Sequence, residues 1–331
     1  MKAVNPRHGT MQVWPRKRAK KPTARVRSWG NKEGLQGFVG FKAGMTRVVA
    51  TDAHKTSMTK GEEVIIPATI IECPPLKIYS VRSYKQDAYG MKVDKEVVVG
   101  KDKNLFRKLF TKKANDTKEL DKLFENKPAA ISLLVLTQPS LVGIGRKKPD
   151  VIELRINGSQ EEIMTFVKEH LTSGIKVSEI FKEGDYLDLH AITTGKGYQG
   201  VIKRFGVALK GHKSEKGQRH VGAHGSWISQ QHWQYRIAYP GQMGYHQRVQ
   251  YGNQILKISD KADEVNPQGG FVHYGEVKNE YLIIRGSVPG PKKRAITLVK
   301  AIRQKPKKTR TKPTVEHVIQ SSQQGRTRSF E

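Results

Sequence analysis

Cysteine is almost absent from this chain, since Cys73 is the only one among 331 residues. A single thiol excludes a disulfide within the chain and a zinc site built from several cysteines. Long apolar runs are missing too, because the longest aliphatic stretch, residues 131–136, is far shorter than the roughly 20 residues that span a bilayer. The first residues are basic and lack the apolar core of a signal peptide. We therefore expect a cytoplasmic protein.

Acidic residues are scarce in three stretches of the chain. Residues 1–32 contain ten Lys/Arg and no acid, residues 194–257 contain ten and a single acid, Glu215, and residues 292–312 contain ten and none. These stretches hold nearly all of the formal net charge of +30. We interpret the remainder as a globular body with three cationic extensions, whose partner is nucleic acid. An anionic membrane is the weaker alternative, because no basic stretch has an amphipathic face.

The stretch 194–257 also lacks a regular apolar pattern, so neither an amphipathic helix nor a half-buried strand fits it. It contains five histidines and eight aromatic residues, and glycine recurs every few residues. We expect a long loop between two strands that buries no core of its own and takes its shape from a polyanion. Lys and Arg neutralise phosphates, while Trp, Tyr and His stack on unpaired bases. Residues 1–32 predict an extended arm; a solvated disordered tail is the alternative, and the interleaved Trp14 and Trp29 favour an arm that orders on RNA.

The rest of the chain favours β-structure. Residues 37–49 indicate two short strands around a glycine turn, and segments rich in Val, Ile and Thr follow between turn residues. Consecutive short strands of this kind predict an antiparallel barrel or sandwich. The further strand candidates are residues 63–73, 76–84, 91–99, 185–192, 254–258, 280–285 and 294–302.

One region interrupts the strand pattern. The apolar positions of residues 102–126 recur at helical spacing, and strands are predicted at 131–136 and 151–156. Ser159 is placed to cap the next helix, with Glu162 at the capping-box position. Helix, strand, strand and helix in succession predict a small α/β insertion that serves packing.

A glycine pattern offers an enzymatic alternative. Gly195, Gly197 and Gly200 match the dinucleotide fingerprint G-x-G-x-x-G and follow a predicted strand. The fingerprint also requires a helix against the pyrophosphate and an acidic residue at the end of a second parallel strand. The following residues predict neither, so we expect these glycines to let the backbone approach an RNA phosphate.

Histidines and carboxylates offer two further alternatives. His220 and His224 have helical spacing, but Gly222 disfavours a helix and no carboxylate stands nearby to support a metal. We therefore expect these histidines to hydrogen bond to RNA or stack on it. Asp185 and Asp188 are separated by an odd number of positions, which puts them on opposite faces of a strand. We interpret both as ordinary strand residues.

A signature joins the end of the insertion to the glycine pattern. It consists of Phe181, Asp188, Ala191, Thr193, Gly195, Lys196, Gly197, Gly200 and Arg204. In these positions the chain resembles the ribosomal protein L3 family of the large subunit. Residues 37–46 are similar to the family's first barrel strands, 14–18 to its N-terminal arm, 225–227 to the tip of its long loop and 241–248 to the return limb. The resemblance covers nearly the whole chain and is of the archaeal type.

The resemblance implies a mainly β fold: a translation-protein-type antiparallel β-barrel with an α/β insertion and long basic RNA-binding extensions. It also implies a structural protein of the large ribosomal subunit, not an enzyme, with no cofactor and no metal. Such a protein binds 23S rRNA near the 3′ end, promotes early subunit assembly and sends the loop tip, Trp227, toward the peptidyl transferase centre. Its expected protein neighbours are the L-fourteen and L-twenty-four types. The competing functions are a nucleotide-using enzyme and an archaeal chromatin or RNA-chaperone protein.

The resulting plan has seven segments. They are the basic arm 1–32, the first barrel part 33–99, the α/β insertion 100–175, a barrel strand within 176–193, the basic loop 194–257, the rest of the barrel 258–303 and the basic tail 304–331. The residues expected to bind RNA are Arg7, His8, Trp14, Arg16, Lys17, Arg18, Lys20, Lys21, Lys196, Lys203, Arg204, His212, Lys213, Lys216, Arg219, His220, Trp227, Trp233, Arg236, Tyr245, His246, Arg248, Lys292, Lys293 and Arg294.

Overall fold

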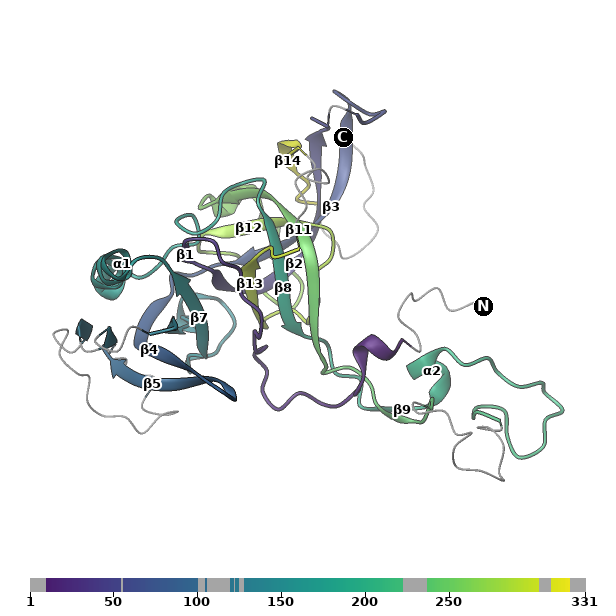
Figure 1. The fold of residues 1–331 in the computed structure, drawn as a ribbon. Helices are drawn as coiled ribbons and strands as arrows, with labels where there is room; N and C mark the ends of the chain where they lie inside the picture. Colours follow the sequence, from purple (N-terminus) through teal and green to yellow (C-terminus); the bar gives the residue numbers. More distant parts are fainter. Residues whose placement is uncertain are drawn as a thin grey trace. The chain divides into compact units, whose positions relative to one another are not determined.

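The computed structural model describes residues 10–54, 56–100, 105, 120–121, 123–124, 128–222, 237–303 and 311–321. The chain divides into two compact units (Figure 1). One, which we call the arm–loop unit, combines Met1–Pro22 with Ile192–Arg248. The other, the β unit, combines Thr23–Ala191 with Val249–Glu331.

A seven-stranded sheet forms the larger part of the β unit. Its strands pair in the order β13-β8-β11-β12-β3-β2-β14, and β13 pairs with β2 as well, so that six strands form a continuous ring of neighbours. The pairs with a described register are antiparallel. This confirms the mainly β fold, whereas the translation-protein-type name stays a prediction. The strands are β2 (Gly37–Thr51), β3 (Glu63–Glu72), β8 (Tyr186–Ile192), β11 (Gln247–Ser259), β12 (Tyr281–Arg285), β13 (Ala295–Lys300) and β14 (Thr314–Val318).

Strand β2 corrects one expectation. Residues 37–49 do not form two strands around a turn, because β2 is one strand of 15 residues with a register shift between Lys42 and Gly44. A β-bulge there bends the strand without ending it. The glycines serve close packing instead: a Cβ on Gly40 would lie 2.8 Å from Cys73 Sγ, and one on Gly44 would lie 2.5 Å from the ring of Phe271.

The second sheet has the strand order β1-β7-β6-β4-β5. Its strands are β1 (Gly34–Leu35), β4 (Lys77–Asp87), β5 (Gly90–Val98), β6 (Ala130–Leu136) and β7 (Val151–Asn157). The sequence plan groups β4 and β5 with the first barrel part, but β4 hydrogen bonds to β6 of the α/β region, and β5 pairs with β4 at the edge of the same sheet. Strand propensity cannot distinguish these partners, because pairing depends on contacts between distant segments.

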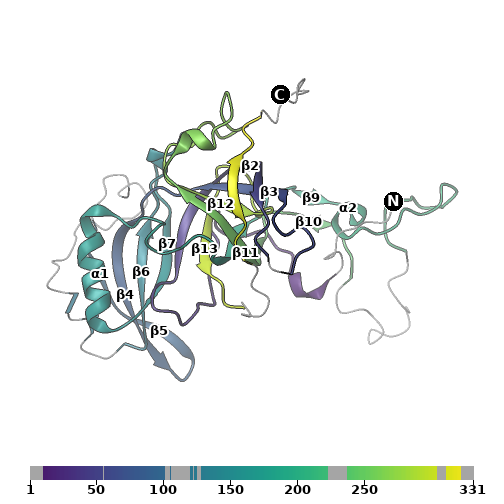
Figure 2. The ribbon, with the colours of Figure 1, turned by 90° about the horizontal axis from the view of Figure 1, so that it is seen from above.

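Helix α1 (Gln160–Ser173) confirms the predicted capping box. Ser159 Oγ accepts a hydrogen bond from Glu162 N, and the Glu162 carboxylate accepts one from Ser159 N. The helix lies beside the second sheet (Figure 2). It buries Ile163, Met164 and Val167 in the hydrophobic core. The predicted helices of residues 102–126 lie largely outside the described residues.

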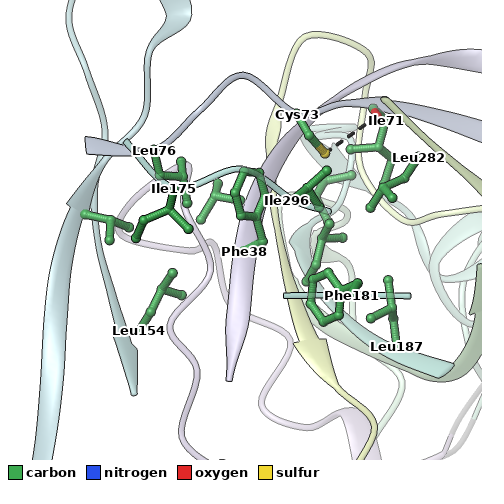
Figure 3. Close-up of a cluster of buried hydrophobic side chains, with 14 of the residues drawn as sticks. Phe38, Ile71, Cys73, Leu76, Leu154, Ile175, Phe181, Leu187, Leu282 and Ile296 are labelled. Carbon is green, nitrogen blue, oxygen red and sulfur yellow. Dashed lines mark hydrogen bonds between the residues drawn. The ribbon is translucent and has the colours of Figure 1, made fainter. Parts of the chain in front are cut away.

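The core of the β unit draws side chains from both sheets (Figure 3). Phe38, Leu154, Phe181 and Leu282 are almost completely excluded from solvent. The acidic residue Glu72 is also buried. Its carboxylate accepts hydrogen bonds from Tyr274 Oη, from the backbone N–H groups of Lys278 and Asn279, and from Asn279 Nδ2. The segment that follows β11 is thereby fixed to the end of β3.

Short elements complete the described chain. They are the 3-10 helices η1 (Met11–Val13), η4 (Pro139–Leu141) and η6 (Ala262–Glu264), the helix α2 (Val201–Phe205), and the strands β9 (Tyr198–Gln199) and β10 (Gly241–Gln242). Strand β14 lies within the segment that the sequence plan treats as a C-terminal tail, and it pairs with the end of β2. Among the described residues, no helix combines the length and the apolar character that crossing a membrane requires.

Candidate nucleic-acid interface

The arm–loop unit begins with a short antiparallel ladder between the glycine pattern and the return limb of the loop. Strand β9 pairs with β10. The ladder continues through the backbone, because Lys196 N donates to Met243 O at 2.9 Å and Met243 N donates to Gly197 O at 2.9 Å. The glycine pattern therefore packs backbone against backbone within the chain.

Gly244 marks the closest approach in this ladder. It is buried, and a Cβ at this position would lie within 3.0 Å of the Thr194 carbonyl oxygen and at 3.0 Å from Lys196 N. Its φ of +72° also belongs to the left-handed region that favours glycine. The two limbs of the loop can meet here only without a side chain.

Helix α2 follows the glycine pattern and has five residues, all before Gly206. A helix of that length after an antiparallel strand does not reproduce the dinucleotide-binding unit. Val201 and Phe205 are buried, and the Trp14 ring stacks on Phe205 with centroids 5.7 Å apart and planes inclined by 25°. This part of the 194–257 stretch thus buries apolar side chains together with the N-terminal arm, a partner that the sequence expectation of a loop shaped by a polyanion did not include.

Arg204 fastens three segments of this unit together. Its guanidinium donates to Tyr239 O at 2.6 Å, to Gln242 O at 3.1 Å and to Arg16 O at 3.3 Å. The Arg16 guanidinium carbon lies 4.5 Å from the centroid of the Phe205 ring, which adds a cation–π contact. Burial lowers the pKa of Arg204, and burial followed by the charge of Arg204 lowers that of Arg16.

His246 makes a second connection to the arm. Its Nδ1 donates to Lys17 O at 2.9 Å, because a carbonyl oxygen can only accept. Burial lowers the pKa of His246, and the charges of nearby arginines act in the same direction. Beside it, Ala19 N donates to Tyr245 O at 2.8 Å, and the Arg18 guanidinium carbon lies 5.5 Å from the Tyr245 ring centroid. We call the contacts of residues 14–19 with 204–205 and 245–246, together with the hydrogen bonds from Arg204 to Tyr239 and Gln242, the clasp.

The clasp changes how several expected RNA-binding side chains are understood. Five of them make contacts inside the chain: Trp14, Arg16, Arg204, Tyr245 and His246. The arm therefore has partners in the loop of the same chain, which the expectation of an arm that orders on RNA did not include. Their direct RNA contacts stay a prediction. No pattern in the sequence links residues 16 and 204.

The arm–loop unit also carries exposed Lys, Arg and His side chains. On the arm they are Lys17, Arg18, Lys20 and Lys21, and on the loop they are Lys196, Lys203, His212, Lys213, Lys216, Arg219 and His220. Tyr198 of β9 is 76% exposed. Lys210, absent from the sequence prediction, lies with its Nζ 3.1 Å from His220 Nε2. Arg248 is half-buried.

The third basic stretch belongs to the β unit. Lys293 is exposed, whereas Lys292 and Arg294 are half-buried. Lys292 Nζ donates to Val272 O at 2.7 Å, so its charge is partly engaged by the protein. Nearby, Lys42 Nζ donates to Val288 O at 2.5 Å and Gly290 O at 3.1 Å. Burial and then the charge of Lys292 lower the pKa of Lys42.

The remaining predicted residues, Arg7, His8, Trp227, Trp233 and Arg236, lie outside the described residues. Within the described part of the chain, no three His, Cys, Asp or Glu side chains gather as ligands of a metal ion.

We expect Arg204→Lys to release the arm from the loop although the charge is kept. A lysine offers one ammonium and cannot replace a planar fork that donates to three carbonyl groups. Charge-assisted hydrogen bonds contribute about 1.5–3 kcal/mol each, so trypsin should cut after Lys17, Arg18 or Lys20 at least about tenfold faster. Lys203→Ala is the matched control, because the neighbouring Lys203 is exposed. Equal cleavage rates in wild type and Arg204→Lys would show that Arg204 does not hold the arm against the loop.

Comparisons with known proteins agree on one family. The model of the family described as ribosomal protein L3 matches residues 1–325. The chain is 42% identical to the large ribosomal subunit protein uL3 of Archaeoglobus fulgidus, over 98% of this chain and 100% of the relative. It is 42% identical to that of Methanothermobacter thermautotrophicus, over 97% and 98%. With the protein of Methanocaldococcus jannaschii the identity is 38%, again over 97% and 98%.

Proposed function

Since this chain belongs to the ribosomal protein L3 family of the large ribosomal subunit, we propose that it is a structural component that binds 23S rRNA near the 3′ end. The arm–loop unit carries this binding. The exposed cations of the arm and of the loop neutralise phosphates, and the clasp holds the two segments together as they do so.

The distribution of charge in the arm–loop unit carries the proposal. Its described surface presents eleven exposed Lys, Arg and His side chains from the predicted set, with Glu215 as the one acidic residue of residues 192–222 and 237–248. An enzyme needs a pocket with a few convergent polar groups, not a broad cationic surface. The five-residue helix after the glycine pattern also disfavours a nucleotide site.

The rest of the proposal follows from the family. The tip of the 194–257 loop, with Trp227, reaches toward the peptidyl transferase centre and supports it. The protein joins the large subunit early in assembly, and its neighbours there are proteins of the L-fourteen and L-twenty-four types. An archaeal chromatin or RNA-chaperone role would require comparable affinity for unrelated nucleic acids.

Chemical probing of 23S rRNA, with and without the full-length protein, tests the proposal. We expect protection to concentrate near the 3′ end and to include nucleotides of the peptidyl transferase centre. A duplex DNA and an unrelated structured RNA of equal length serve as competitors. Protection spread evenly over the RNA, or equal competition by the DNA, would refute a specific rRNA-binding function.

We expect the arm lysines to determine part of the salt dependence of binding. Replacing Lys17, Lys20 and Lys21 together by Gln keeps the clasp, since only the backbone carbonyl of Lys17 takes part in it. Each lost phosphate contact should lower the slope of log affinity against log salt by roughly 0.7–0.9, so the triple variant should lose about 2–3. The control replaces Lys77, Lys85 and Lys168, exposed lysines of the β unit. An unchanged slope in the arm variant would show that these lysines do not contact phosphate.

A further inference from the structure

Two exposed side chains of the β unit form a stack that the sequence analysis did not single out. The Arg303 guanidinium carbon lies 4.3 Å from the centroid of the Tyr251 ring. Tyr251 is 47% exposed, and Arg303 is exposed as well. A guanidinium at this distance is held over the ring by the cation–π attraction. The pair therefore presents a flat cationic and aromatic surface to solvent.

The backbone under Tyr251 is fixed by its neighbours. Gln250 Nε2 donates to Asn253 Oδ1 at 2.6 Å and to Ser287 O at 2.9 Å, and Asn253 Nδ2 donates back to Gln250 O at 3.2 Å. Between them, Gly252 has a φ of +67°, a conformation that suits glycine. These contacts turn the start of β11 so that Tyr251 stands on the surface.

Asp188 of β8 joins the two halves of the stack. This carboxylate is 1% exposed, and β8 and β11 are neighbours in the sheet (Figure 1). Its Oδ1 accepts from Gly252 N at 2.9 Å and its Oδ2 accepts from Ile302 N at 3.1 Å. Because Gly252 and Ile302 adjoin Tyr251 and Arg303, one buried side chain sets both positions. Asp188 is therefore more than the ordinary strand residue that its spacing suggested.

We propose that Tyr251 and Arg303 bind an unpaired base of the rRNA by stacking, with Asp188 as the positioning residue beneath them; this rests on the proposed rRNA binding. Aromatic rings and guanidinium planes are the surfaces on which proteins stack splayed-out bases. Arg303 also lies in the stretch 292–312, which has ten Lys/Arg and no acid and therefore attracts a polyanion, and the aromatic face beside it favours RNA, whose bases can stack there. The guanidinium edge adds donors for the adjoining phosphate.

Binding of the full-length protein to a transcript of the 23S rRNA 3′ region tests this site. Tyr251→Ala should weaken binding by roughly 5- to 150-fold, the range for one base stacked on an aromatic side chain, without changing the salt slope. Tyr251→Phe keeps the ring and should bind within about twofold of wild type. Arg303→Lys should bind more weakly at an unchanged slope, whereas Arg303→Ala should also lower the slope by roughly 0.7–0.9.

Chemical probing of the same complexes should show loss of protection at one or a few unpaired nucleotides in Tyr251→Ala. Both side chains are exposed, so thermal unfolding should be unchanged in these variants. If wild type binds the transcript and Tyr251→Ala binds equally well with the same protections, the stacking site is wrong while rRNA binding stands. If wild type itself does not bind the transcript preferentially, the proposed function fails first.

Discussion

Gly244→Ala is expected to open the base of the arm–loop unit and abolish ordered rRNA binding by the loop. The new Cβ would lie within 3.0 Å of the Thr194 carbonyl oxygen, and alanine is strained at a φ of +72°. Backbone strain of this kind costs on the order of 1–3 kcal/mol, and the collision with backbone atoms adds to it. The ladder between Thr194–Lys196 and Met243–Tyr245 cannot form with that group in place.

Limited proteolysis and rRNA probing measure this effect together. Tryptic cleavage of Gly244→Ala should begin in the arm and in residues 196–219, while the β unit survives, because its core lies in a different part of the chain. The protections that depend on the loop should disappear. Gly200→Ala is the control, since a Cβ on Gly200 meets no atom within 4 Å. A Gly244→Ala protein with wild-type cleavage and protection would show that the ladder tolerates a side chain.

Glu72→Leu should cause the largest loss of stability in the β unit. Leucine would leave Tyr274 Oη and the N–H groups of Lys278 and Asn279 without their acceptor, and Asn279 Nδ2 would keep only Leu141 O. Each buried donor left unsatisfied costs about 1–3 kcal/mol, so we expect a loss of about 4 kcal/mol or more in the free energy of unfolding. Burial and the neighbouring Glu72 charge both raise the pKa of Tyr274, so its hydroxyl keeps the proton that it donates.

Urea unfolding of the free protein gives the measurement. Glu72→Gln should lose only about 1–2 kcal/mol, because the amide oxygen can still accept from Lys278 and Asn279 while its NH₂ donates to Tyr274 Oη. Glu63→Gln, at the exposed start of the same strand, should be neutral. Equal stability of Glu72→Leu and wild type would mean that water replaces the carboxylate.

Local chemistry explains what the sequence could predict of the fold. The helix after Ser159 could be predicted because its capping box needs only Ser159 and Glu162, three residues apart. The glycines of β2 led to the wrong prediction of a turn. In the sequence, a glycine that makes room for Cys73 or Phe271 cannot be distinguished from one that forms a turn. Likewise, the sheet to which β4 belongs depends on β6, more than forty residues later in the chain.

In the candidate site, too, contacts between segments distant in the sequence could not be predicted. Its charge and its place in the signature put Arg204 among the expected RNA-binding residues, but its acceptors on Arg16, Tyr239 and Gln242 are brought together only by the fold. Tyr251 and Arg303 were missed for the same reason, because their contact depends on a buried carboxylate of a third segment. A basic composition indicates the class of partner, nucleic acid. Which basic residues bind within the protein and which remain exposed can be seen only in the structure.

The clasp has a consequence for how tightly the protein stays on its RNA. Under the proposed rRNA binding, the arm and the loop would reach the RNA as one bivalent ligand, because Ala19 bonds to Tyr245 and Lys17 to His246. Once either segment is bound, the other faces its own site at an effective concentration that can reach the millimolar range for a short connection. On that proposal, a segment that dissociates should be recaptured before the protein leaves, and the lifetime of the complex should exceed what either segment could sustain alone.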